Sequence, residues 1–373
     1  MNCLSKYKLI AKGACLTGSA VAMLGISSLA MGQAIDLVVV SWGGAYSKSQ
    51  QLAYHDPFMA DNPNVNIVND DNAPEGVAKI RAQAEVGNVT WSLVDAIASD
   101  AITLCDEGLI EEIDHDAVLA AAPDGTPASV DMGEFIVSEC FVPQIVYSTT
   151  FGYRTDLVAE PPTTIGDVFD LAKIPGKRSL EKRPINNLEW ALLADGVSAD
   201  AVYDMLETPE GLAQAFAKLD TVKDQVVWWE KGAQTPQLLA DGEVVMGSTY
   251  NGRLFSVIEE DKQPIAMMWD WQVFDIDGWV IPKGAPHRDE TLQLLRFATD
   301  TQRLADQAKY ISYGPVRASS APLVGKHASL GIEMAPHMPT DPNNAKTTLL
   351  FNYEWWADNR DDMNEKFAAW IEQ

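Results

Sequence analysis

Residues 37–46 read LVVVSWGGAY, and the fold prediction starts from this stretch. Its first four residues are a short apolar run, typical of a strand that is buried on both faces of a parallel sheet. Two glycines follow, where backbone N–H groups can approach a ligand, between the rings of Trp42 and Tyr46. Because ligands bind at the carboxyl ends of parallel strands, the stretch predicts a buried strand that leads into a ligand-binding loop.

Strands and helices alternate along the chain after this loop. Residues 65–68 and 91–98 predict strands, and residues 75–86 and 101–108 predict helices that end at glycines. Further strands are expected at 142–149, 244–249 and 278–282, with helices from Pro209 (capped by Thr208), over 289–307 (capped by Asp289) and over 354–371. This alternation is typical of an α/β protein with ligands at the strand ends.

The first 34 residues predict a signal peptide. Three lysines open the chain without an acidic residue, an apolar or small run covers residues 14–31, and small residues surround an exit near Ala34. We therefore expect export to the periplasm with cleavage near Ala34. About 340 residues remain, which exceeds what one hydrophobic core usually holds and predicts two lobes.

The charge of the chain excludes several kinds of partner. Its formal net charge is −26, and removal of three lysines with the leader makes the mature chain about −29. Nucleic acid binding depends on a basic face, so nucleic acid is not expected as a partner, and an anionic membrane surface is disfavoured for the same reason. Most of this acidity serves solubility, although it also attracts cations toward an acidic cleft.

The cysteines predict one disulfide. Two of the four lie in the leader, and the remaining pair, Cys105 and Cys140, is bound for an oxidising compartment. Two buried free thiols are the alternative. Neither cysteine has a CxxC partner, so a metal site or redox catalysis has little support.

Motifs of common enzyme classes do not occur in the sequence. It contains no GxSxG, GxGxxG, GK[ST] phosphate loop or HExxH. We expect neither catalysis nor a cofactor nor a metal. A secreted hydrolase that uses carboxylates alone stays open as the alternative from another class.

Aromatic residues recur beside acids and predicted strand ends. The clusters are residues 42–46, Ser99 with Asp100, Trp228 and Trp229 before Glu230, and Trp269 before Asp270, with Asp275 and Asp277 close behind. An ammonium group gains from an aromatic face and from a carboxylate, so these clusters favour an amine ligand. Core packing is the alternative for each tryptophan, and it is the preferred interpretation of Trp355, Trp356 and Trp370 on the predicted terminal helix.

Four segments carry a resemblance to a known family. They are residues 39–44, residues 241–244 leading to 250–252, residues 279–282 and residues 313–316. In their order and spacing the chain resembles the periplasmic binding proteins of ABC importers, in the branch of the spermidine/putrescine-binding proteins, over essentially the whole mature chain. The resemblance implies a type II fold of two α/β lobes, joined by hinge strands, that closes over a ligand and delivers it to a membrane permease. The expected boundaries are 35–145 for the first part of lobe 1, 146–278 for lobe 2, and 279–373 for the return to lobe 1 and the C-terminal helices.

The resemblance also implies a set of site residues. Trp42 and Tyr46 would line one wall, and Ser99 would face the pocket from the first lobe. Tyr250 and Asp277 would contribute from the second lobe and the hinge, and Tyr313 would close the rim. Further candidates from the aromatic–acid clusters are Asp100, Trp228, Trp229 and Trp269.

Two arginines depart from the polyamine pattern. Arg183 lies where those proteins carry acids for amine ends, and Arg253 directly follows the turn at 250–252. Arginine suits bidentate recognition of a carboxylate, so an arginine in the cleft would favour a zwitterion such as γ-aminobutyrate or a betaine. Surface pairing with the many acids is the alternative. The prediction is thus a monomeric binding protein that favours a polyamine, with the zwitterion as the alternative ligand.

Overall fold

The computed structural model describes residues 34–373, which form one compact unit. The predicted signal peptide, apart from Ala34, lies outside these residues, and so does its whole predicted apolar run. Within the described part, no helix is both long and apolar enough to cross a membrane.

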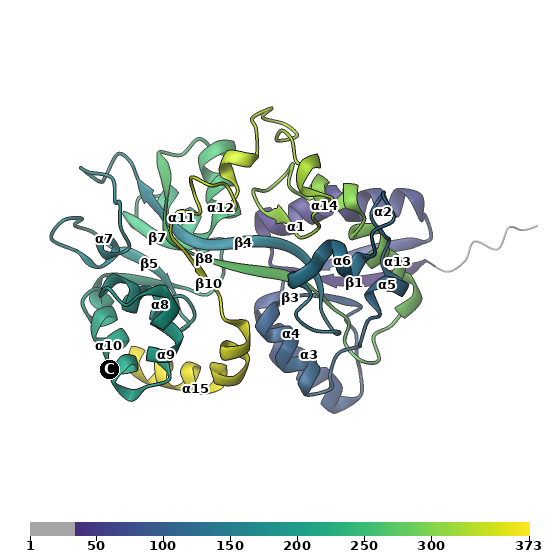
Figure 1. The fold of residues 1–373 in the computed structure, drawn as a ribbon, viewed down its shortest axis with the longest axis horizontal. Coiled ribbons are helices and arrows are strands. Elements are labelled where there is room, and N and C mark those ends of the chain that lie inside the picture. The colour runs from purple at the N-terminus through teal and green to yellow at the C-terminus, as the bar shows by residue number, and fades with distance from the viewer. Residues whose placement is uncertain (1–33) are drawn as a thin grey trace, which may run out of the picture. The chain divides into compact units, whose positions relative to one another are not determined.

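One continuous sheet runs through the described unit, and helices cover it (Figure 1). Its strands are β1 (Ile35–Val40), β2 (Val65–Asp70), β3 (Leu93–Ile97), β4 (Val142–Arg154), β5 (Arg178–Glu181), β6 (Val226–Trp229), β7 (Met246–Tyr250), β8 (Ile265–Val280), β9 (Gly314–Pro315) and β10 (Thr348–Leu350). The order is β2-β1-β3-β8-β4-β7-β5-β6, with β10 beside β8 and β9 beside β4. Parallel pairing of β1 with β2 and β3 confirms the buried parallel strand expected at residues 37–40.

Most of the helices are short. They are α1 (Gly44–Gln50), α2 (Asp56–Asp61), α3 (Gly76–Val86), α4 (Ala98–Asp106), α5 (His115–Val118), α6 (Ala128–Met132), α7 (Gly166–Phe169), α8 (Asn187–Ala194), α9 (Val202–Leu206), α10 (Pro209–Asp220), α11 (Gln234–Ala240), α12 (Asn251–Phe255), α13 (Arg288–Ala298), α14 (Thr301–Gln307) and α15 (Tyr353–Ile371). The mixed α/β prediction is confirmed.

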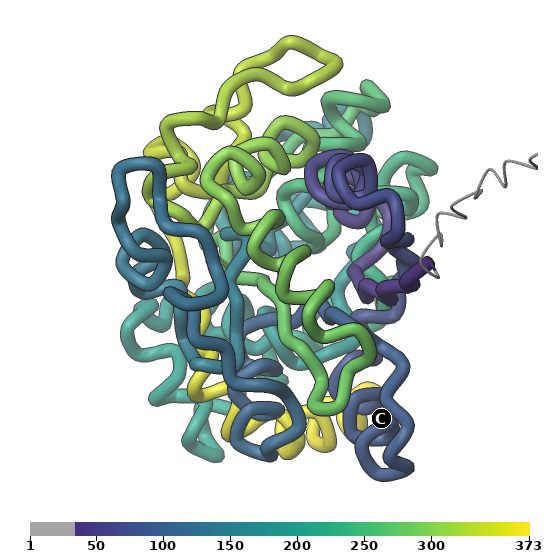
Figure 2. The backbone as a smooth tube through the Cα atoms, turned by 90° about the vertical axis from the view of Figure 1, so that its right-hand side faces the viewer, coloured from purple at the N-terminus to yellow at the C-terminus, as the bar shows by residue number. Residues whose placement is uncertain are grey.

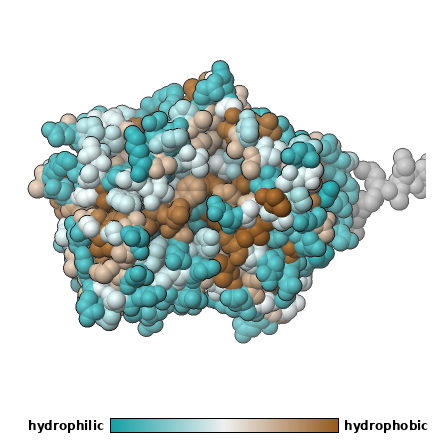
Figure 3. Space-filling model, in the orientation of Figure 1, coloured by the Kyte–Doolittle hydropathy of each residue, from teal (hydrophilic) through white to brown (hydrophobic). Residues whose placement is uncertain are grey.

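Two long antiparallel strands, β4 and β8, connect the halves of the sheet. They pair from Val142 opposite Trp279 to Arg154 opposite Ile265, with register shifts near Pro143 and Thr149. The predicted lobe boundaries at 145/146 and 278/279 fall inside these strands. Figure 1 shows both strands crossing between the two groups of helices, and Figure 3 shows hydrophobic surface gathered across the middle of the same face.

Each half of the sheet has its own hydrophobic core. We call the part around the cluster of Leu37, Val94 and Leu295 the first lobe, and the part around Leu180 and Met246 the second lobe. The first lobe combines distant segments of the chain, since α13 after β8 packs on the helices after β1 (Figure 2).

The terminal helix α15 adds its aromatic side chains to the second core. Trp356, Phe367 and Trp370 are buried, and the ring centroids of Phe216 and Trp370 lie 5.4 Å apart. This confirms core packing for the tryptophans of this helix. Between Trp356 and Phe367, Arg360 of the same helix forms an ion pair with Asp100 of α4 and hydrogen bonds to Ser99.

The helix expected over 289–307 differs in the structure in two ways. It is divided into two helices, because the chain breaks at Thr299 and the Asp300 side chain caps α14 by accepting from Gln302 N at 2.9 Å. Asp289 lies in the first turn of α13 and not at its cap. By contrast Thr208 caps α10 as predicted, accepting from Gly211 N at 3.0 Å.

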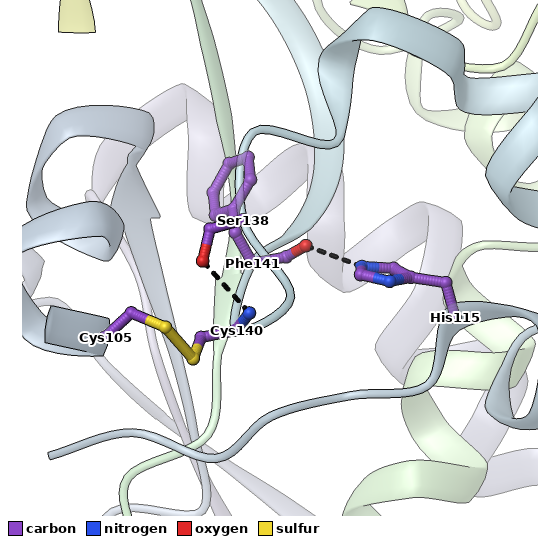
Figure 4. Close-up of a disulfide and its surroundings, with 5 residues drawn as sticks. All are labelled: Cys105, His115, Ser138, Cys140 and Phe141. Atoms are coloured by element: carbon purple, nitrogen blue, oxygen red, sulfur yellow. Dashed lines mark hydrogen bonds between the residues drawn. A yellow bond between two sulfur atoms is a disulfide. The ribbon is translucent and has the colours of Figure 1, made fainter. Parts of the chain in front are cut away.

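The predicted disulfide between Cys105 and Cys140 is present and joins α4 to the segment before β4 (Figure 4). On either side of this bridge the backbone has further partners. Ser138 Oγ accepts from Cys140 N at 3.1 Å, and His115 Nε2 donates to the Phe141 carbonyl at 2.8 Å. The bridge therefore fixes the chain just before it enters hinge strand β4.

Replacing both cysteines by serine is expected to lower the free energy of unfolding by about 3–4 kcal/mol, because the bridge closes a loop between residues 35 positions apart. Urea unfolding of the wild type and the double variant measures this difference. Reduction of the wild type should reproduce the loss, and an equal midpoint in all three samples would contradict it.

Candidate ligand-binding site

A cavity of about 510 Å³ of empty space, including its mouth, lies where the two lobes meet at the hinge strands. Its lining is mostly aromatic and apolar, with a few charged groups, as is usual for small-molecule sites. The lining residues are Trp42, Tyr46 and Ile97 of the first lobe, Ile145, Tyr147, Asp275 and Asp277 of β4 and β8, Arg183, Ile185, Asn186, Tyr250 and Arg253 of the second lobe, and Tyr313 before β9.

Asp277 is the centre of a buried hydrogen-bond network. Its Oδ2 accepts from Trp42 Nε1 at 2.8 Å, and its Oδ1 lies 2.9 Å from the Tyr46 hydroxyl. Asp95 belongs to the same network, and both of its carboxylate oxygens accept from Gln50 Nε2 at 3.0 Å. The sequence places Asp277 here because β3 and the end of β8 are paired, with Ile97 opposite Asp277.

Asp275 lies two residues earlier on the same strand and therefore on the same face of the sheet. Its Oδ2 accepts from the Tyr147 hydroxyl at 2.9 Å, and its Oδ1 accepts from Ile276 N at 2.7 Å. Tyr147 of β4 is opposite Asp275 in the strand register. The hinge strands thus carry two adjacent carboxylates into the cavity.

Burial makes these carboxylates hard to ionise. It raises the pKa of Asp275 to about 7. Burial, followed by the nearby Asp95 carboxylate, raises the pKa of Asp277 well above its ordinary value. A cation in the cavity would offset both effects, because an opposite charge favours the ionised form of an acid.

Four tyrosines surround the carboxylates. The ring centroids of Tyr46 and Tyr313 lie 5.8 Å apart, those of Tyr147 and Tyr250 lie 5.5 Å apart, and those of Tyr147 and Tyr313 lie 6.1 Å apart. Their faces suit an alkylammonium group, which gains about 2 kcal/mol over an aromatic ring once water is excluded.

Arg183 enters the lining from the segment after β5. Its Nε donates to Glu181 Oε1 at 2.8 Å, and its Nη2 faces the same oxygen. Burial alone would lower the pKa of Arg183, but Glu181 and the neighbouring tyrosines raise it overall, so the guanidinium stays charged. No hydrogen bond within residues 34–373 engages its Nη1, which remains a donor for a ligand.

Arg253 of α12 is 4% exposed and also reaches the cavity. Its Nη2 donates to the Trp42 carbonyl at 2.9 Å and its Nη1 to the Gly43 carbonyl at 3.1 Å. The guanidinium lies 5.7 Å from the centroid of the Tyr250 ring. Arg253 is therefore buried, whereas the Arg183 side chain is 37% exposed and is paired with Glu181 at the edge of the cavity.

Of the twelve predicted site residues, seven line this cavity and five do not. The seven are Trp42, Tyr46, Arg183, Tyr250, Arg253, Asp277 and Tyr313. The structure places Ser99 and Asp100 against Arg360 of α15, because α4 turns this end toward the terminal helix. Trp228 packs on Phe367 and Trp370 in the second core.

The other two tryptophans also lie outside the lining. Trp229 is buried next to Tyr250, with ring centroids 6.0 Å apart, at the end of β6, which pairs with β5. Trp269 is half-buried on β8 before the strand reaches the cavity. Tyr147 and Asp275 are lining residues that the site prediction missed. The Asp275-Ile276-Asp277 alternation was the available signal, since in a strand it puts both carboxylates on one face.

Residues 34–373 hold no group of three or more His, Cys, Asp or Glu side chains that could bind a metal ion. The cavity instead offers carboxylates and tyrosine faces for an amine, and arginine N–H groups for a carboxylate.

Comparisons with known proteins agree with this chemistry. A family model described as bacterial extracellular solute-binding protein matches residues 53–340. A γ-aminobutyric acid-binding protein of Pseudomonas aeruginosa is 35% identical over 347 residues, which cover 93% of this chain and 94% of that protein.

Solved structures give the same picture. The periplasmic binding protein MotA of A. tumefaciens B6 in complex with glucopine has a TM-score of 0.80 at 28% identity, covering 90% of this chain and 100% of that one. The Atu4243-GABA receptor has a TM-score of 0.75 at 32% identity, covering 90% and 97%. The spermidine/putrescine-binding protein PotD of Streptococcus pneumoniae, at 15% identity and a TM-score of 0.65, covering 91% and 100%, shares the fold.

These matches bear on the predictions in different ways. The type II periplasmic binding protein fold and the resemblance to importer binding proteins are confirmed. The prediction that the chain is not an enzyme is confirmed by relatives that are binding proteins. The favoured polyamine ligand gains no specific support, and the zwitterionic alternative agrees better with the relatives.

Proposed function

The chain belongs to the family of bacterial extracellular solute-binding proteins, and we propose that its solute is a small zwitterion of the γ-aminobutyrate (GABA) type. As a binding protein of an ABC importer, it would capture this solute between its lobes and deliver it to the permease. We further propose that it works as a periplasmic monomer whose leader is removed near Ala34.

The observation that carries this proposal is the charge of the cavity lining. Asp275 and Asp277 line the same small cavity as Arg183 and Arg253. A diamine would satisfy the carboxylates but would place its second cation beside arginine. A zwitterion matches both signs, because charge-assisted hydrogen bonds form at each end.

The amine end of the ligand needs N–H donors. A cation in the cavity favours the ionised form of Asp277 and Asp275, and a primary ammonium can then donate to them while its carbon chain contacts the tyrosines. A betaine has no N–H group and would leave the carboxylates without this hydrogen bond. The lining therefore favours GABA over glycine betaine, in agreement with what the two GABA-binding relatives are named for.

Calorimetry on the mature protein tests the proposal. The panel is GABA, putrescine, spermidine, glycine betaine, common amino acids and glucopine. We expect GABA to bind with a dissociation constant of about 1 μM, or about −8 kcal/mol. Binding of the diamines without GABA would overturn the zwitterion proposal, and binding of glucopine alone would replace GABA by a larger amino-acid conjugate.

The affinity for GABA is expected to fall as the pH is lowered. The ammonium binds the ionised carboxylates, so a protonated Asp275, with its pKa of about 7, must release its proton first. The Asp275 proton alone weakens binding by about tenfold between pH 8 and pH 6, where GABA itself keeps both charges, and a proton on Asp277 would add to this loss. Calorimetry at several pH values, in buffers of different ionisation enthalpy, measures both the affinity and the proton release.

The same pKa shifts predict that the stability of the ligand-free protein changes with pH in the opposite direction to the affinity, which provides a control. Without ligand, the folded state keeps protons on Asp275 and Asp277 that the unfolded state releases near pH 4. The ligand-free protein should therefore lose stability as the pH rises from about 4 to 7. Constant affinity between pH 8 and pH 6, with no proton release, would contradict the assignment of these carboxylates to the amine.

A further inference from the structure

Arg253 joins the second lobe to the backbone of the first. Its helix, α12, begins directly after β7, and its guanidinium reaches the loop after β1. There it donates to the carbonyl oxygens of Trp42 at 2.9 Å and Gly43 at 3.1 Å. Both acceptors are main-chain atoms, so these contacts depend on the distance between the lobes and not on the identity of the first-lobe side chains.

Two glycines make room for this guanidinium. A Cβ on Gly44 of the first lobe would lie 3.0 Å from Arg253 Nη1, and a Cβ on Gly232 of the second lobe would lie 2.8 Å from Arg253 Nε. Gly44 also has a φ of 61°, in the left-handed region that favours glycine. The glycine-containing segment at residues 42–46 therefore leaves space for the Arg253 guanidinium.

The two residues before Arg253 contact residues 311–313, the segment that leads into β9. Asn251 Nδ2 donates to the Ser312 carbonyl at 2.6 Å. A Cβ on Gly252 would lie 2.6 Å from both Ile311 Cγ1 and Tyr313 Cε1. The first turn of α12 is thus closely fitted to residues 311–313.

We propose that Arg253 is a positioning residue that holds the lobes closed over the ligand, while Arg183 receives the ligand carboxylate. The inference rests on the proposed capture of a solute between the lobes. Contacts that exist only in the closed form shift the population toward it. Because the lobes must separate for release, the guanidinium has to leave the carbonyls of Trp42 and Gly43 before the ligand can dissociate.

Trp42 couples this contact to the ligand. Its indole N–H donates to Asp277, the carboxylate assigned to the amine, while its carbonyl accepts from Arg253. Ionised Asp277 with bound ammonium therefore orders the loop on which the arginine closes.

The experiment measures GABA release and lobe distance in Arg253→Met and Arg253→Lys. Dissociation is followed by stopped-flow tryptophan fluorescence, and distance by spin labels on cysteines placed at Val86 and Leu157, which are 73% and 50% exposed. The two native cysteines of the described chain are bridged, so the labels attach where intended. Lys262→Met removes a cation that is 65% exposed from the same lobe and is the matched control.

We expect Arg253→Met to bind GABA but release it at least about tenfold faster, with a smaller closed fraction at saturation, and Arg253→Lys to be intermediate. Release and distances equal to the wild type would overturn the proposal. So would complete loss of GABA binding with the lobes still closing, which would make Arg253 a ligand contact.

If the wild-type protein does not bind GABA, the proposed solute is refuted, but the proposed closure role of Arg253 is not. The closure role is then judged from the ligand-free distances, where Arg253→Met must reduce the closed fraction relative to the wild type and the Lys262→Met control. Equal ligand-free distributions in that case would overturn the closure role as well.

Discussion

Asp277→Asn is expected to weaken GABA binding by about 100-fold or more. The substitution keeps the size of the side chain but removes the charge that faces the ammonium. Truncating one partner of a buried, hydrogen-bonded charge pair costs about 2–5 kcal/mol, and 100-fold corresponds to about 2.7 kcal/mol. Calorimetry with GABA on the purified mature variant measures the loss.

The stability of the same variant should move the other way. Burial and Asp95 raise the pKa of Asp277, so its ionised form destabilises the ligand-free fold above that pKa. Asparagine carries no charge, and the unfolding free energy at about pH 8 should be unchanged or higher. A variant that lost binding because it misfolded would show a lower value.

Asp95→Asn is the matched control. Asp95 is buried in the same network, where it accepts from Gln50, but it does not line the cavity. Its substitution should reduce the affinity for GABA much less than Asp277→Asn does. Equal losses in the two variants would mean that the network is structural and that Asp277 has no special contact with the amine.

The fold was predictable because its signals are local. The apolar run at residues 37–40 and the glycines after it mark a parallel strand and its loop, and the structure has β1 followed by α1 there. Thr208 before Pro209 marks a helix start that the structure keeps. Such signals depend on neighbouring residues, so a single sequence carries them.

Contacts between distant segments set the limit of the site prediction. Tyr147 meets Asp275 because β4 and β8 pair across the hinge, 128 positions apart in the chain. Trp228 was a candidate for the cavity but packs on α15. The sequence around Trp228 does not indicate that α15 packs there. An aromatic residue beside an acid looks the same in sequence whether its ring contacts a ligand or a core.

Two sets of residues favoured different ligands: the resemblance along the framework favoured a polyamine, and the two arginines favoured a zwitterion. The resemblance to polyamine-binding proteins covers the general features of the fold, whereas Arg183 and Arg253 are departures from that pattern. Both line the cavity with Asp275 and Asp277. Departures at a binding site carry more information on the ligand than similarity along the framework, because fold does not determine what a site recognises.

Arg183→Met is expected to weaken GABA binding by about 100-fold while leaving putrescine binding unchanged or stronger, because it removes a carboxylate partner and a cation from the cavity. The simple variant also leaves Glu181, which is 4% exposed and hydrogen bonded to Arg183, without its cation. Its loss of affinity could then come from a disturbed β5 end and not from the ligand.

The double variant Arg183→Met/Glu181→Gln separates these causes. Removing both charges takes away the unpaired acid, so the second core and β5 should regain wild-type stability in urea unfolding. If Arg183 contacts the ligand carboxylate, the double variant still binds GABA about 100-fold more weakly than the wild type. If GABA affinity returns with stability, Arg183 only neutralises Glu181, and recognition of the carboxylate must be assigned to Arg253.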